Sequence, residues 1–225
     1  MLTAKVGVGN CAYMKALIFT GGECPSLAKL RELASRAELL IAADSGLTTA
    51  LSAELFPDFV IGDFDSLDNL EYLRRFPPEN VIRYPVEKDF TDTEIAVNFA
   101  ENKGADSIAI AGGGGGRLDH TLALFELIKR DNQVRAWHTK MEAVYKIDAR
   151  ETLRAVGPLG MVVSVFPLGY NADSMTSEGL KWPLNGLSWT IGQFGISNVS
   201  VLDRISIRAG NTPLLAILPP EASVS

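Results

Sequence analysis

Aspartates recur directly after short apolar runs in the first half of the sequence. Asp44 follows one such run, Asp63 and Asp65 follow a second, and Asp92 and Asp119 come after a third and a fourth. In open α/β sheets, ligands bind beyond the carboxyl ends of the strands. If these runs are parallel neighbouring strands, their carboxylates share one rim. There they repel one another unless a cation offsets their charge, so the pattern predicts a divalent cation site.

Asp63 and Asp65 stand two positions apart in Gly62-Asp63-Phe64-Asp65-Ser66. On an extended segment both side chains point the same way, with their Cα atoms about 7 Å apart. Mg²⁺ takes one or two carboxylates and completes its octahedron with phosphate oxygens and water, so a phosphate substrate becomes part of the metal site. The competing interpretation is a solvated turn, which the flanking Gly62 and the apolar Phe64 disfavour. For Asp44 and Asp119 alone, a helix cap is as good an interpretation as a functional one.

The segment Lys88-Asp89-Phe90-Thr91-Asp92-Thr93-Glu94 carries structural and chemical signals together. Thr91 and Glu94 have the spacing of a capping box, which predicts the start of a helix. That start places Asp92 in the first turn and Asp89 on the entry loop. We expect both carboxylates to face the strand ends, where Lys88 can offset phosphate charge.

A run of five glycines, 112–116, is followed by Arg117-Leu118-Asp119-His120 and then by a helical pattern. Flexible backbone at a helix N-terminus lets a phosphate approach closely, and Arg117 can add charge-assisted hydrogen bonds. The chain lacks the Gly-x-x-x-x-Gly-Lys-Ser/Thr pattern of P-loop proteins. A bare glycine run can also be a loose turn, but Arg-x-Asp-His at a helix start favours a phosphate site.

Short apolar strands alternate with longer helical patterns as far as about Ile147, which is typical of a mostly parallel sheet with helices on both faces. This predicts a Rossmann-like α/β fold. The expected strands are Ala16 to Thr20, Leu39 to Ala43, Phe59 to Ile61, Val81 to Tyr84, Ser107 to Ala111, Val134 to His138 and Ala143 to Ile147. The clearest expected helices are Ser26 to Ala37, Thr91 to Lys103 and Asp119 to Lys129.

Beyond Asp148 the helical periodicity disappears, and short alternating runs are separated by Gly, Pro, Asn and Ser. This predicts an all-β domain, a sandwich. We expect an N-terminal extension over residues 1–14, an α/β domain over 15–148 and a β-sandwich over 149–225. The expected C-terminal strands are Glu151 to Val156, Met161 to Phe166, Ser188 to Gln193, Arg204 to Arg208 and Leu214 to Leu218.

The formal net charge of −6 argues against a nucleic-acid polymer as partner, because backbone binding needs a basic face. Cys11 and Cys24 form neither a disulfide framework nor a metal-ligand spacing, which fits a reducing compartment. No apolar run approaches the roughly 20 residues that span a bilayer. We therefore expect a cytoplasmic protein that binds neither nucleic acid nor membrane.

Four motifs in order resemble the thiamine pyrophosphokinase family: Ala43-Asp44-Ser45-Gly46, Gly62-Asp63-Phe64-Asp65-Ser66, Lys88-Asp89-Phe90-Thr91-Asp92-Thr93-Glu94 and Gly115-Gly116-Arg117-Leu118-Asp119-His120. The C-terminal Gly179-Leu180-Lys181-Trp182-Pro183-Leu184 and Ser197-Asn198 are similar to the thiamine-binding domain of that family. The resemblance implies a homodimer that transfers diphosphate from ATP to the thiamine hydroxyl with release of AMP. It also implies Mg²⁺ as cofactor and a thiamine site between subunits, with Trp182 stacking from the partner chain.

The roles that the resemblance implies cover both halves of the chain. Catalytic roles fall to Asp63, Asp65, Asp89, Asp92 and Arg117, and metal binding falls to Asp63, Asp65 and Asp92. The nucleotide is expected against Asp44, Ser45, Gly46, Gly62, Lys88, Thr91, Gly115, Gly116, Arg117, Asp119 and His120. Thiamine is expected against Lys88, Asp92, Leu180, Trp182, Ser197 and Asn198.

Three questions stay open at this point. Either Asp89 or Asp92 is expected to accept the proton of the acceptor hydroxyl. Another pyrophosphokinase on the same scaffold, acting on a pterin-like alcohol, is the closest rival, although Trp182 and the second domain argue against it. A nucleotide or thiamine sensor without turnover is the rival from another class. The intact set of mutually repelling carboxylates disfavours that rival.

Overall fold

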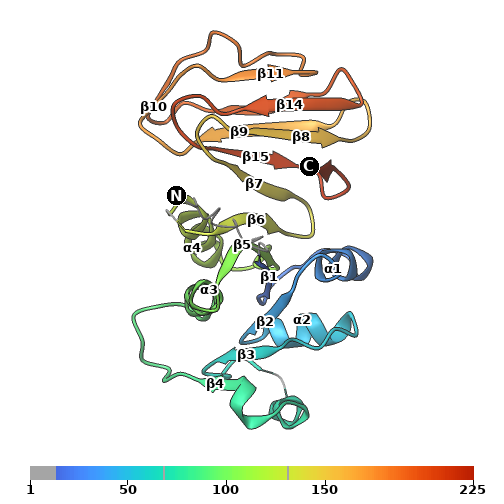
Figure 1. Ribbon diagram of the computed structural model, residues 1–225, viewed down its shortest axis with the longest axis vertical. Helices are drawn as coiled ribbons and strands as arrows, with labels where there is room; N and C mark the ends of the chain where they lie inside the picture. Colours follow the sequence, from blue (N-terminus) through green and yellow to red (C-terminus); the bar gives the residue numbers. More distant parts are fainter. Residues whose placement is uncertain (1–13, 68, 131) are drawn as a thin grey trace, which may run out of the picture.

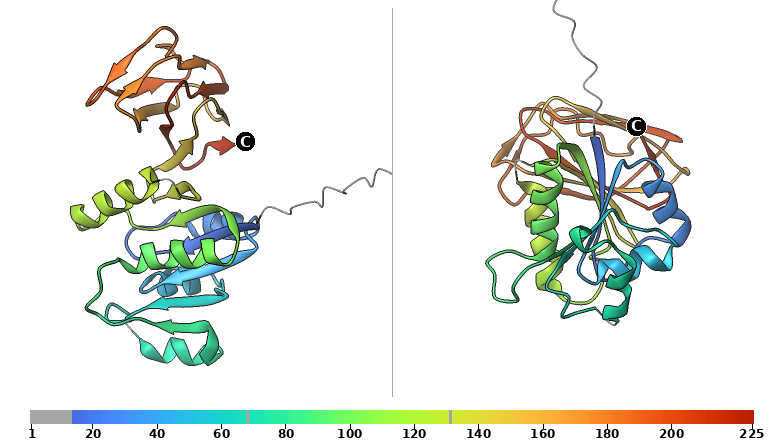
Figure 2. Two further views of the ribbon diagram at one scale, coloured as in Figure 1. Left: turned by 60° about the vertical axis from the view of Figure 1, so that its left-hand side comes forward. Right: turned by 60° about the horizontal axis from the view of Figure 1, so that its bottom comes forward.

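The fold is that of a computed structural model, which describes residues 14–67, 69–130 and 132–225. A ten-stranded sheet runs the length of the molecule, with helices around one end and a second sheet over the other (Figures 1 and 2). The predicted α/β fold with a C-terminal β-sandwich is confirmed. The extension expected over residues 1–14 lies almost wholly outside the described residues.

The helical end of the sheet is built from parallel strands. These are β5 (Ala105–Ala111), β1 (Met14–Phe19), β2 (Leu39–Ala43), β3 (Phe59–Gly62) and β4 (Val81–Arg83), adjacent in that order. Every neighbouring pair is parallel. Their carboxyl ends therefore meet at one edge, as the aspartate pattern requires.

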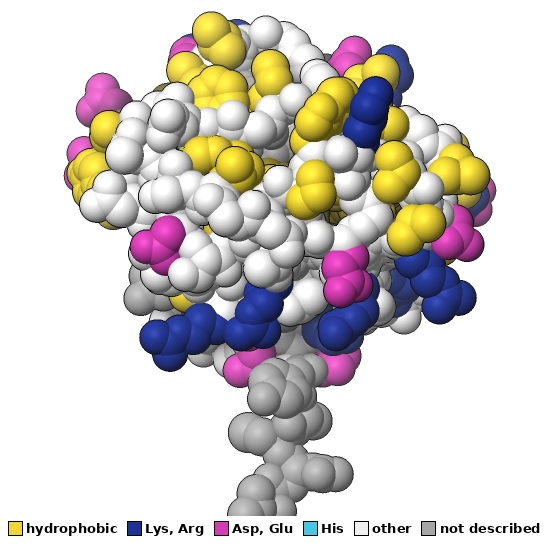
Figure 3. Space-filling view, turned by 90° about the horizontal axis from the view of Figure 1, so that it is seen from above, with side chains coloured by type: hydrophobic (Ala, Val, Ile, Leu, Met, Phe, Trp, Pro, Cys, Tyr) yellow, Lys and Arg dark blue, Asp and Glu magenta, His cyan; other side chains and the backbone are white. Residues whose placement is uncertain are grey.

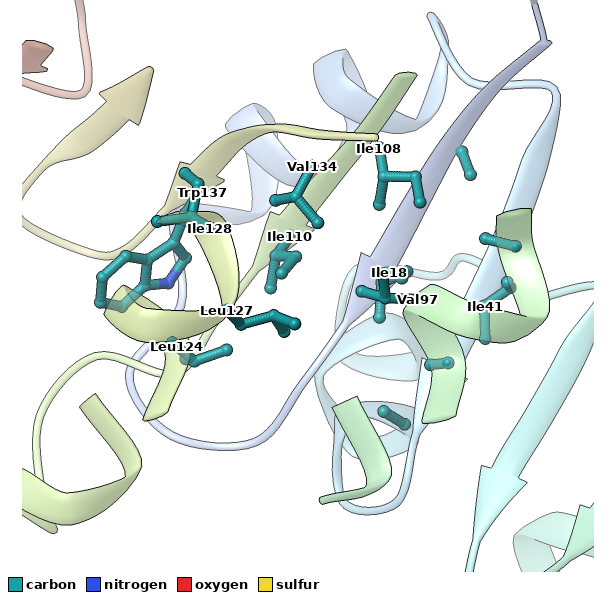
Figure 4. Packing of buried hydrophobic residues seen from close by; sticks show 14 of the residues in the cluster. Ile18, Ile41, Val97, Ile108, Ile110, Leu124, Leu127, Ile128, Val134 and Trp137 are labelled. Carbon is teal, nitrogen blue, oxygen red and sulfur yellow. The ribbon is translucent and has the colours of Figure 1, made fainter. Parts of the chain in front are cut away.

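Helices cover both faces of these strands. In β1, Ala16 and Ile18 pack in the cluster that includes α3 (Asp92–Asn102) and α4 (Leu118–Lys129), whereas Leu17 and Phe19 pack with α1 (Leu27–Ala34) and α2 (Gly46–Ser52). The alternation follows from the two-residue period of a strand. Figure 4 shows the α4 side, where Leu124, Leu127 and Ile128 meet side chains of β5 and β6 (Val134–His138).

The long sheet changes direction at β6 and β7 (Ala143–Ile147). β6 is parallel to β5, β7 is antiparallel to β6, and the sheet continues through β15 (Leu214–Leu218), β9 (Val162–Pro167) and β13 (Gly195–Val199). The sheet is thus continuous across residue 148. The expected division of the chain there stays a prediction, and any two domains defined by it share one sheet.

The second sheet closes the sandwich. It has the order β11 (Thr176–Glu178), β14 (Arg204–Arg208), β8 (Thr152–Val156) and β16 (Ser223–Val224), and a separate pair joins β10 (Asn171–Ala172) to β12 (Trp189–Thr190). Leu214 and Ala216 of β15 lie in the sandwich core, while Leu215 of the same strand lies in the core of the helical end. One strand therefore contributes to both cores.

Several expected elements have different bounds. The strand expected over Ser188 to Gln193 is only Trp189–Thr190, because the chain turns there: Gly192 has φ +81° and Gln193 donates back to the Thr190 carbonyl. The helix expected from Ser26 to Ala37 ends at Ala34. Helix α2 and the short 3-10 helices η1 (Leu70–Arg75) and η2 (Pro78–Asn80) were not expected.

The sandwich end carries exposed apolar side chains. Figure 3 looks onto this end and shows several groups of hydrophobic side chains between uncharged polar surface. The exposed residues of this half include Tyr170, Trp182, Ile191, Phe194 and Ile196. Within the described part of the chain, no helix combines the length and apolar character needed to cross a bilayer.

Candidate active site

A cavity of about 540 Å³ opens at the carboxyl ends of the parallel strands. Its walls come from the ends of β1, β2 and β3, the loop between β4 and α3, the glycine-rich loop after β5, and one side of α4. The volume falls in the range of small-molecule sites, roughly 300–1,000 Å³. The predicted site residues that line it are Asp44, Ser45, Asp65, Lys88, Thr91, Asp92, Gly115, Gly116, Arg117 and His120.

Asp44, Asp63 and Asp65 form the one group of acidic, histidine or cysteine side chains in the described residues that could hold a metal ion. Each offers an oxygen, and the three oxygens lie within 4.8 Å of one another. Asp44 is 8% exposed, and its Oδ1 is buried without a hydrogen-bond partner. A buried carboxylate oxygen left unpaired is costly, so the group fits a divalent cation that prefers oxygen ligands.

The segment that carries Asp63 and Asp65 is a turn, so the expectation of an extended segment was wrong. β3 ends at Gly62, and Phe64 has φ +65°. The turn is held because the Phe64 ring is buried beneath it, and the Asp65 amide donates to Asp63 Oδ1 at 3.2 Å. The turn still brings both carboxylates together with Asp44.

The charges of this group shift the pKa values of its members in opposite directions. Burial raises the pKa of the Asp44 carboxyl above its usual value, and the charges of Asp63 and Asp65 raise it further. The hydrogen bond from Lys88 instead lowers the pKa of Asp63. Asp63 is therefore ionised more readily than Asp44, because Asp63 has a cationic partner and Asp44 has none.

Asp92 lies apart from the acidic group and faces Lys88. The Lys88 ammonium contacts Asp63 Oδ2 and lies 3.3 Å from Asp92 Oδ1, without hydrogen-bond geometry at the second carboxylate. Burial raises the pKa of Asp92, and Lys88 opposes that shift. The structure thus groups Asp44, rather than the expected Asp92, with Asp63 and Asp65.

The predicted capping box places Asp92. Thr91 Oγ1 accepts from the Glu94 amide at 3.2 Å, and Glu94 Oε2 accepts from the Thr91 amide at 3.0 Å. Arg130, beyond the end of α4, holds the other oxygen of Glu94 at 2.6 Å. Asp92 is therefore the first residue of a helix whose first turn is held by Thr91 and Arg130 through Glu94. Asp89 is exposed and is not among the residues that line the cavity, and its expected part in the reaction stays a prediction.

The glycine-rich loop is tied to the end of β1. Gly113 donates to the Gly21 carbonyl at 2.6 Å, and Glu23 donates to the Gly114 carbonyl at 2.6 Å. Gly112 has φ +114°, and a Cβ there would lie 2.3 Å from the Thr20 carbonyl oxygen. Only glycine permits so close an approach. The run is therefore an ordered loop against β1 and not a loose turn.

The segment after the glycines provides a cationic group at the mouth of the cavity. Arg117 is exposed and pairs with both oxygens of Asp119, at 3.1 and 2.5 Å. This partner lowers the pKa of Asp119 to about 2. Arg117 and His120 line the cavity, whereas Asp119 does not. Asp119 therefore holds Arg117 in place, and its expected contact with the nucleotide stays a prediction.

Gly46 and Gly62 also stand behind the cavity wall. Gly46 begins α2, and Gly62 ends β3; neither lines the cavity, whereas Ser45 does. An added Cβ at Gly46 would lie 2.1 Å from the Phe19 carbonyl oxygen. These two glycines let neighbouring backbones approach and so position Asp44 and Asp63.

The residues expected to bind thiamine gather on the sandwich, away from this cavity. Asn198 accepts from the Trp182 amide at 3.2 Å and donates to the Trp182 carbonyl at 2.6 Å. Leu180 is buried, Ser197 is exposed, and Trp182 is 55% exposed. The Lys181 ammonium lies over the Trp182 ring, 4.8 Å from its centroid, so one face of this ring already contacts a cation. None of these residues lines the cavity within one chain.

Sequence reasoning missed much of the cavity wall. Thr20 and Thr93 line it and share a hydrogen bond at 2.9 Å, and Ser66 follows Asp65 on the same wall. The apolar part comes from Val86 and Phe90 on one side and from Ala123, Leu124 and Leu127 of α4 on the other. The helical period of the sequence predicted α4 itself. The same period fits a helix that packs only on the sheet, so it did not show that α4 also lines a cavity.

Two protein-family models match the chain in succession. The first, "Thiamin pyrophosphokinase, catalytic domain", matches residues 30–138, and the second, "Thiamin pyrophosphokinase, vitamin B1 binding domain", matches residues 145–212. Together they cover most of the cavity lining and most of the sandwich.

Relatives of known sequence and structure agree with these matches. The chain is 31% identical over 186 residues to a thiamine pyrophosphokinase of Bacillus subtilis, covering 78% of this chain and 84% of that protein. The crystal structure of a B. subtilis thiamine pyrophosphokinase is similar with a TM-score of 0.75 and 26% identity, covering 92% of this chain and 99% of that one. A Geobacillus thermodenitrificans structure of the same description gives 0.73 and 26%, covering 92% and 97%.

Proposed function

This chain belongs to the thiamine pyrophosphokinase family, and we propose that its strand-end cavity binds ATP with Mg²⁺ and directs the β-phosphorus toward the thiamine hydroxyl. The reaction of the family is a diphosphate transfer, so ATP is the donor and AMP the second product. A pyrophosphokinase for another alcohol is not favoured, because the sandwich matches the vitamin B1 binding domain.

The observation that carries the proposal is the carboxylate group at the ends of β2 and β3. We assign Mg²⁺ to Asp44, Asp63 and Asp65, because their oxygens lie within 4.8 Å and Asp44 Oδ1 is buried and unpaired. This replaces the set of Asp63, Asp65 and Asp92. When bound, Mg²⁺ would offset the charge of the triphosphate and polarise the β-phosphorus.

The phosphates would lie between this group and the glycine-rich loop. Gly115 and Gly116 line the cavity and precede α4, whose N-terminal amides favour an anion. Arg117 is exposed at the same place and can exchange Asp119 for phosphate oxygens. Positioning and charge stabilisation of this kind supply most of the rate in phosphoryl transfers.

Asp92 is the better candidate to accept the proton of the thiamine hydroxyl. It lines the cavity at the start of α3, whereas Asp89 is exposed outside it. Burial raises the pKa of Asp92, which makes its carboxylate a stronger base than an exposed one. Its neighbour Lys88 remains available to the phosphates.

The proposed acceptor side of the site combines residues of two copies of the chain. Leu180, Trp182, Ser197 and Asn198 do not line the cavity of their own chain, and Trp182 is 55% exposed. We propose a homodimer in which Trp182 of the partner subunit stacks on the cationic thiazolium of thiamine. Exposed apolar side chains such as Tyr170, Phe194 and Ile196 supply an apolar surface for such contacts.

The net charge of −6 fits small-molecule substrates rather than a nucleic-acid polymer. The free Cys24 fits a reducing compartment. We therefore propose a cytoplasmic location.

Replacing Asp65 tests the metal assignment. Asp65→Ala is expected to lose AMP formation by at least about a hundredfold, since it removes a carboxylate that faces the triphosphate. Mn²⁺ binding, followed by electron paramagnetic resonance, should weaken in parallel, while the circular dichroism spectrum stays unchanged.

The matched control is Asp203→Ala, an exposed aspartate in the loop between β13 and β14. It should keep the turnover and Mn²⁺ affinity of the unmodified chain. Turnover of Asp65→Ala near that of the unmodified chain would contradict the assignment.

A further inference from the structure

Lys88 places a positive charge inside the group of carboxylates. Its side chain is 12% exposed, and those of its partners Asp63 and Asp92 are 8% and 20% exposed. The ammonium is thus a resident counter-cation in a nearly buried position.

Asp63 is shared between this ammonium and the proposed metal position. Its Oδ2 contacts Lys88, while an oxygen of the same carboxylate lies within 4.8 Å of oxygens of Asp44 and Asp65. A divalent cation held by these three aspartates would therefore lie close to the ammonium and be repelled by it.

The triphosphate changes this balance. Lys88 itself lines the cavity, in the loop between β4 and α3 that also exposes Val86 and Phe90. When phosphate oxygens occupy the cavity, the ammonium gains anionic partners other than Asp63. The same oxygens supply further ligands to the metal ion.

We propose that Lys88 competes with the divalent cation for Asp63, so that the empty site binds the metal weakly and loads it together with the triphosphate. The inference rests on the proposed function of this cavity and makes Lys88 a positioning residue that sets the order of loading. Asp92 is the second ion-pair partner of the ammonium. We do not assign it to the metal ion that binds without the triphosphate.

Other cations near the cavity do not have this role. Arg117 is paired with Asp119, and Lys140 lies 3.7 Å from Glu23 with 61% of its side chain exposed. Within the described residues, Lys88 is the one Lys or Arg in an ion pair with Asp44, Asp63, Asp65 or Asp92. Lys140 therefore provides a matched control for the loss of one positive charge near the site.

The test is a Mn²⁺ titration of the metal-free full chain, with free Mn²⁺ measured by electron paramagnetic resonance. Each variant is titrated alone and with α,β-methylene-ATP. In this analogue a methylene group replaces the oxygen that bridges the α- and β-phosphorus, so the bond that diphosphate transfer would break is absent. For the unmodified chain we expect weak binding alone and much tighter binding with the analogue. For Lys88→Met we expect binding alone to be about tenfold tighter, because the repelling charge is gone.

The analogue should then tighten Mn²⁺ binding by a smaller factor in Lys88→Met than in the unmodified chain. Lys88→Arg, which keeps the charge, and Lys140→Met should each stay within about twofold of the unmodified chain. If Lys88→Met does not fold, Lys88→Gln replaces it with the same expected direction. Mn²⁺ affinity of the empty site that is unchanged or weaker in the folded Lys88 variant would overturn the proposal.

This readout is independent of the reaction. An unmodified chain that binds Mn²⁺ as expected and forms no AMP from ATP and thiamine would overturn the proposed function and leave the competition at Asp63 standing. An unmodified chain that forms both products, but whose Lys88 variant gains no Mn²⁺ affinity, would overturn only the role of Lys88.

Discussion

At the scale of single residues, the site is defined by how each carboxylate is compensated. Asp63 has Lys88, Asp119 has Arg117, and Asp44 has a buried oxygen with no partner. Because the buried Asp44 carboxylate has no cationic partner, its negative charge lowers the stability of the metal-free protein more than the charges of Asp63 and Asp119 do. The same property makes Asp44 the best indicator of where a cation would bind.

The pKa shift of Asp44 predicts how stability depends on pH. A carboxyl with a raised pKa in the folded state contributes stability that is fully present below its unfolded value and is lost as the pH rises through the folded value. The metal-free protein should therefore lose this contribution above about pH 4. Asp44→Asn carries no charge, so it should become the more stable protein by about 1 kcal/mol, or about 2–4 °C in Tm, at neutral pH.

Thermal unfolding of both proteins in chelator at several pH values measures this difference. Saturating Mg²⁺ should reverse it, because the unmodified chain binds the metal more tightly. Asp203→Asn, exposed on the sandwich, should show no such trend. A difference between the unmodified chain and Asp44→Asn that does not change with pH would contradict the assignment of a buried, unpaired charge at Asp44.

At the scale of elements, helix starts and strand ends place the chemistry. The capping box of α3 sets Asp92, and the loop that enters α3 carries Lys88. Thr91→Ala should cost about 1 kcal/mol of stability, the usual value of an N-cap, and should also reduce turnover because Asp92 loses its position. Thr91→Ser, which keeps the hydroxyl, should restore both.

Ser26 provides the matched control, because it caps α1 on the opposite face of the sheet. Ser26→Ala should lose a similar amount of stability without a change in kcat. Equal losses of kcat in the two alanine variants, measured at a temperature where both are folded, would show that the cap of α3 has no special role in the reaction.

The sequence predicted the elements that follow local rules. Strand ends at Ala43 and Ala111, the capping box at Thr91 and the Arg117 helix start all depend on short-range pattern, and the structure has them. The parallel register then brought Asp44 and Asp65 to one edge. Asp92 was expected beside them as a metal ligand, but the path of the β4–α3 loop instead places it on Lys88, and loop paths have no period to read.

Long-range pairing was harder to predict. The apolar side chains of β15 would follow the same pattern in a strand of a separate sandwich and in a strand that extends the first sheet. In the structure β15 belongs to the long sheet and contributes side chains to both cores. The Phe64 ring is buried in one cluster with residues distant in the sequence, such as Ala42 and Leu47, and the positive φ of Phe64 accompanies that burial. Helix α2 is short and contains two threonines, so local propensity gave little signal for it.

At the scale of the whole molecule, the proposed enzyme needs two chains for each site. The cavity residues lie at the carboxyl ends of the parallel strands, whereas Trp182 and Asn198 belong to the sandwich, which Figure 1 shows at the other end of the long sheet. In a symmetric dimer, the same surfaces of the two chains meet, and each site can combine both halves. Activity then becomes a property of the pair of chains.

Complementation between two inactive variants tests this arrangement. Asp65→Ala removes the metal side and Trp182→Ala the thiamine side, so each homodimer should be nearly inactive. After denaturation and refolding of an equal mixture, half of the dimers are mixed and one of their two sites is intact, giving about a quarter of the activity of the unmodified chain. Activity no greater than the mean of the two variants would place both sides of the site in one chain.

The most direct test of the central claim is the identity of both products formed by the purified chain. With ATP, Mg²⁺ and thiamine, the account predicts AMP and thiamine diphosphate in equal amounts, and neither product when a chelator removes the metal. Formation of ADP with thiamine monophosphate, or of no product at all, would contradict diphosphate transfer at the strand-end aspartates.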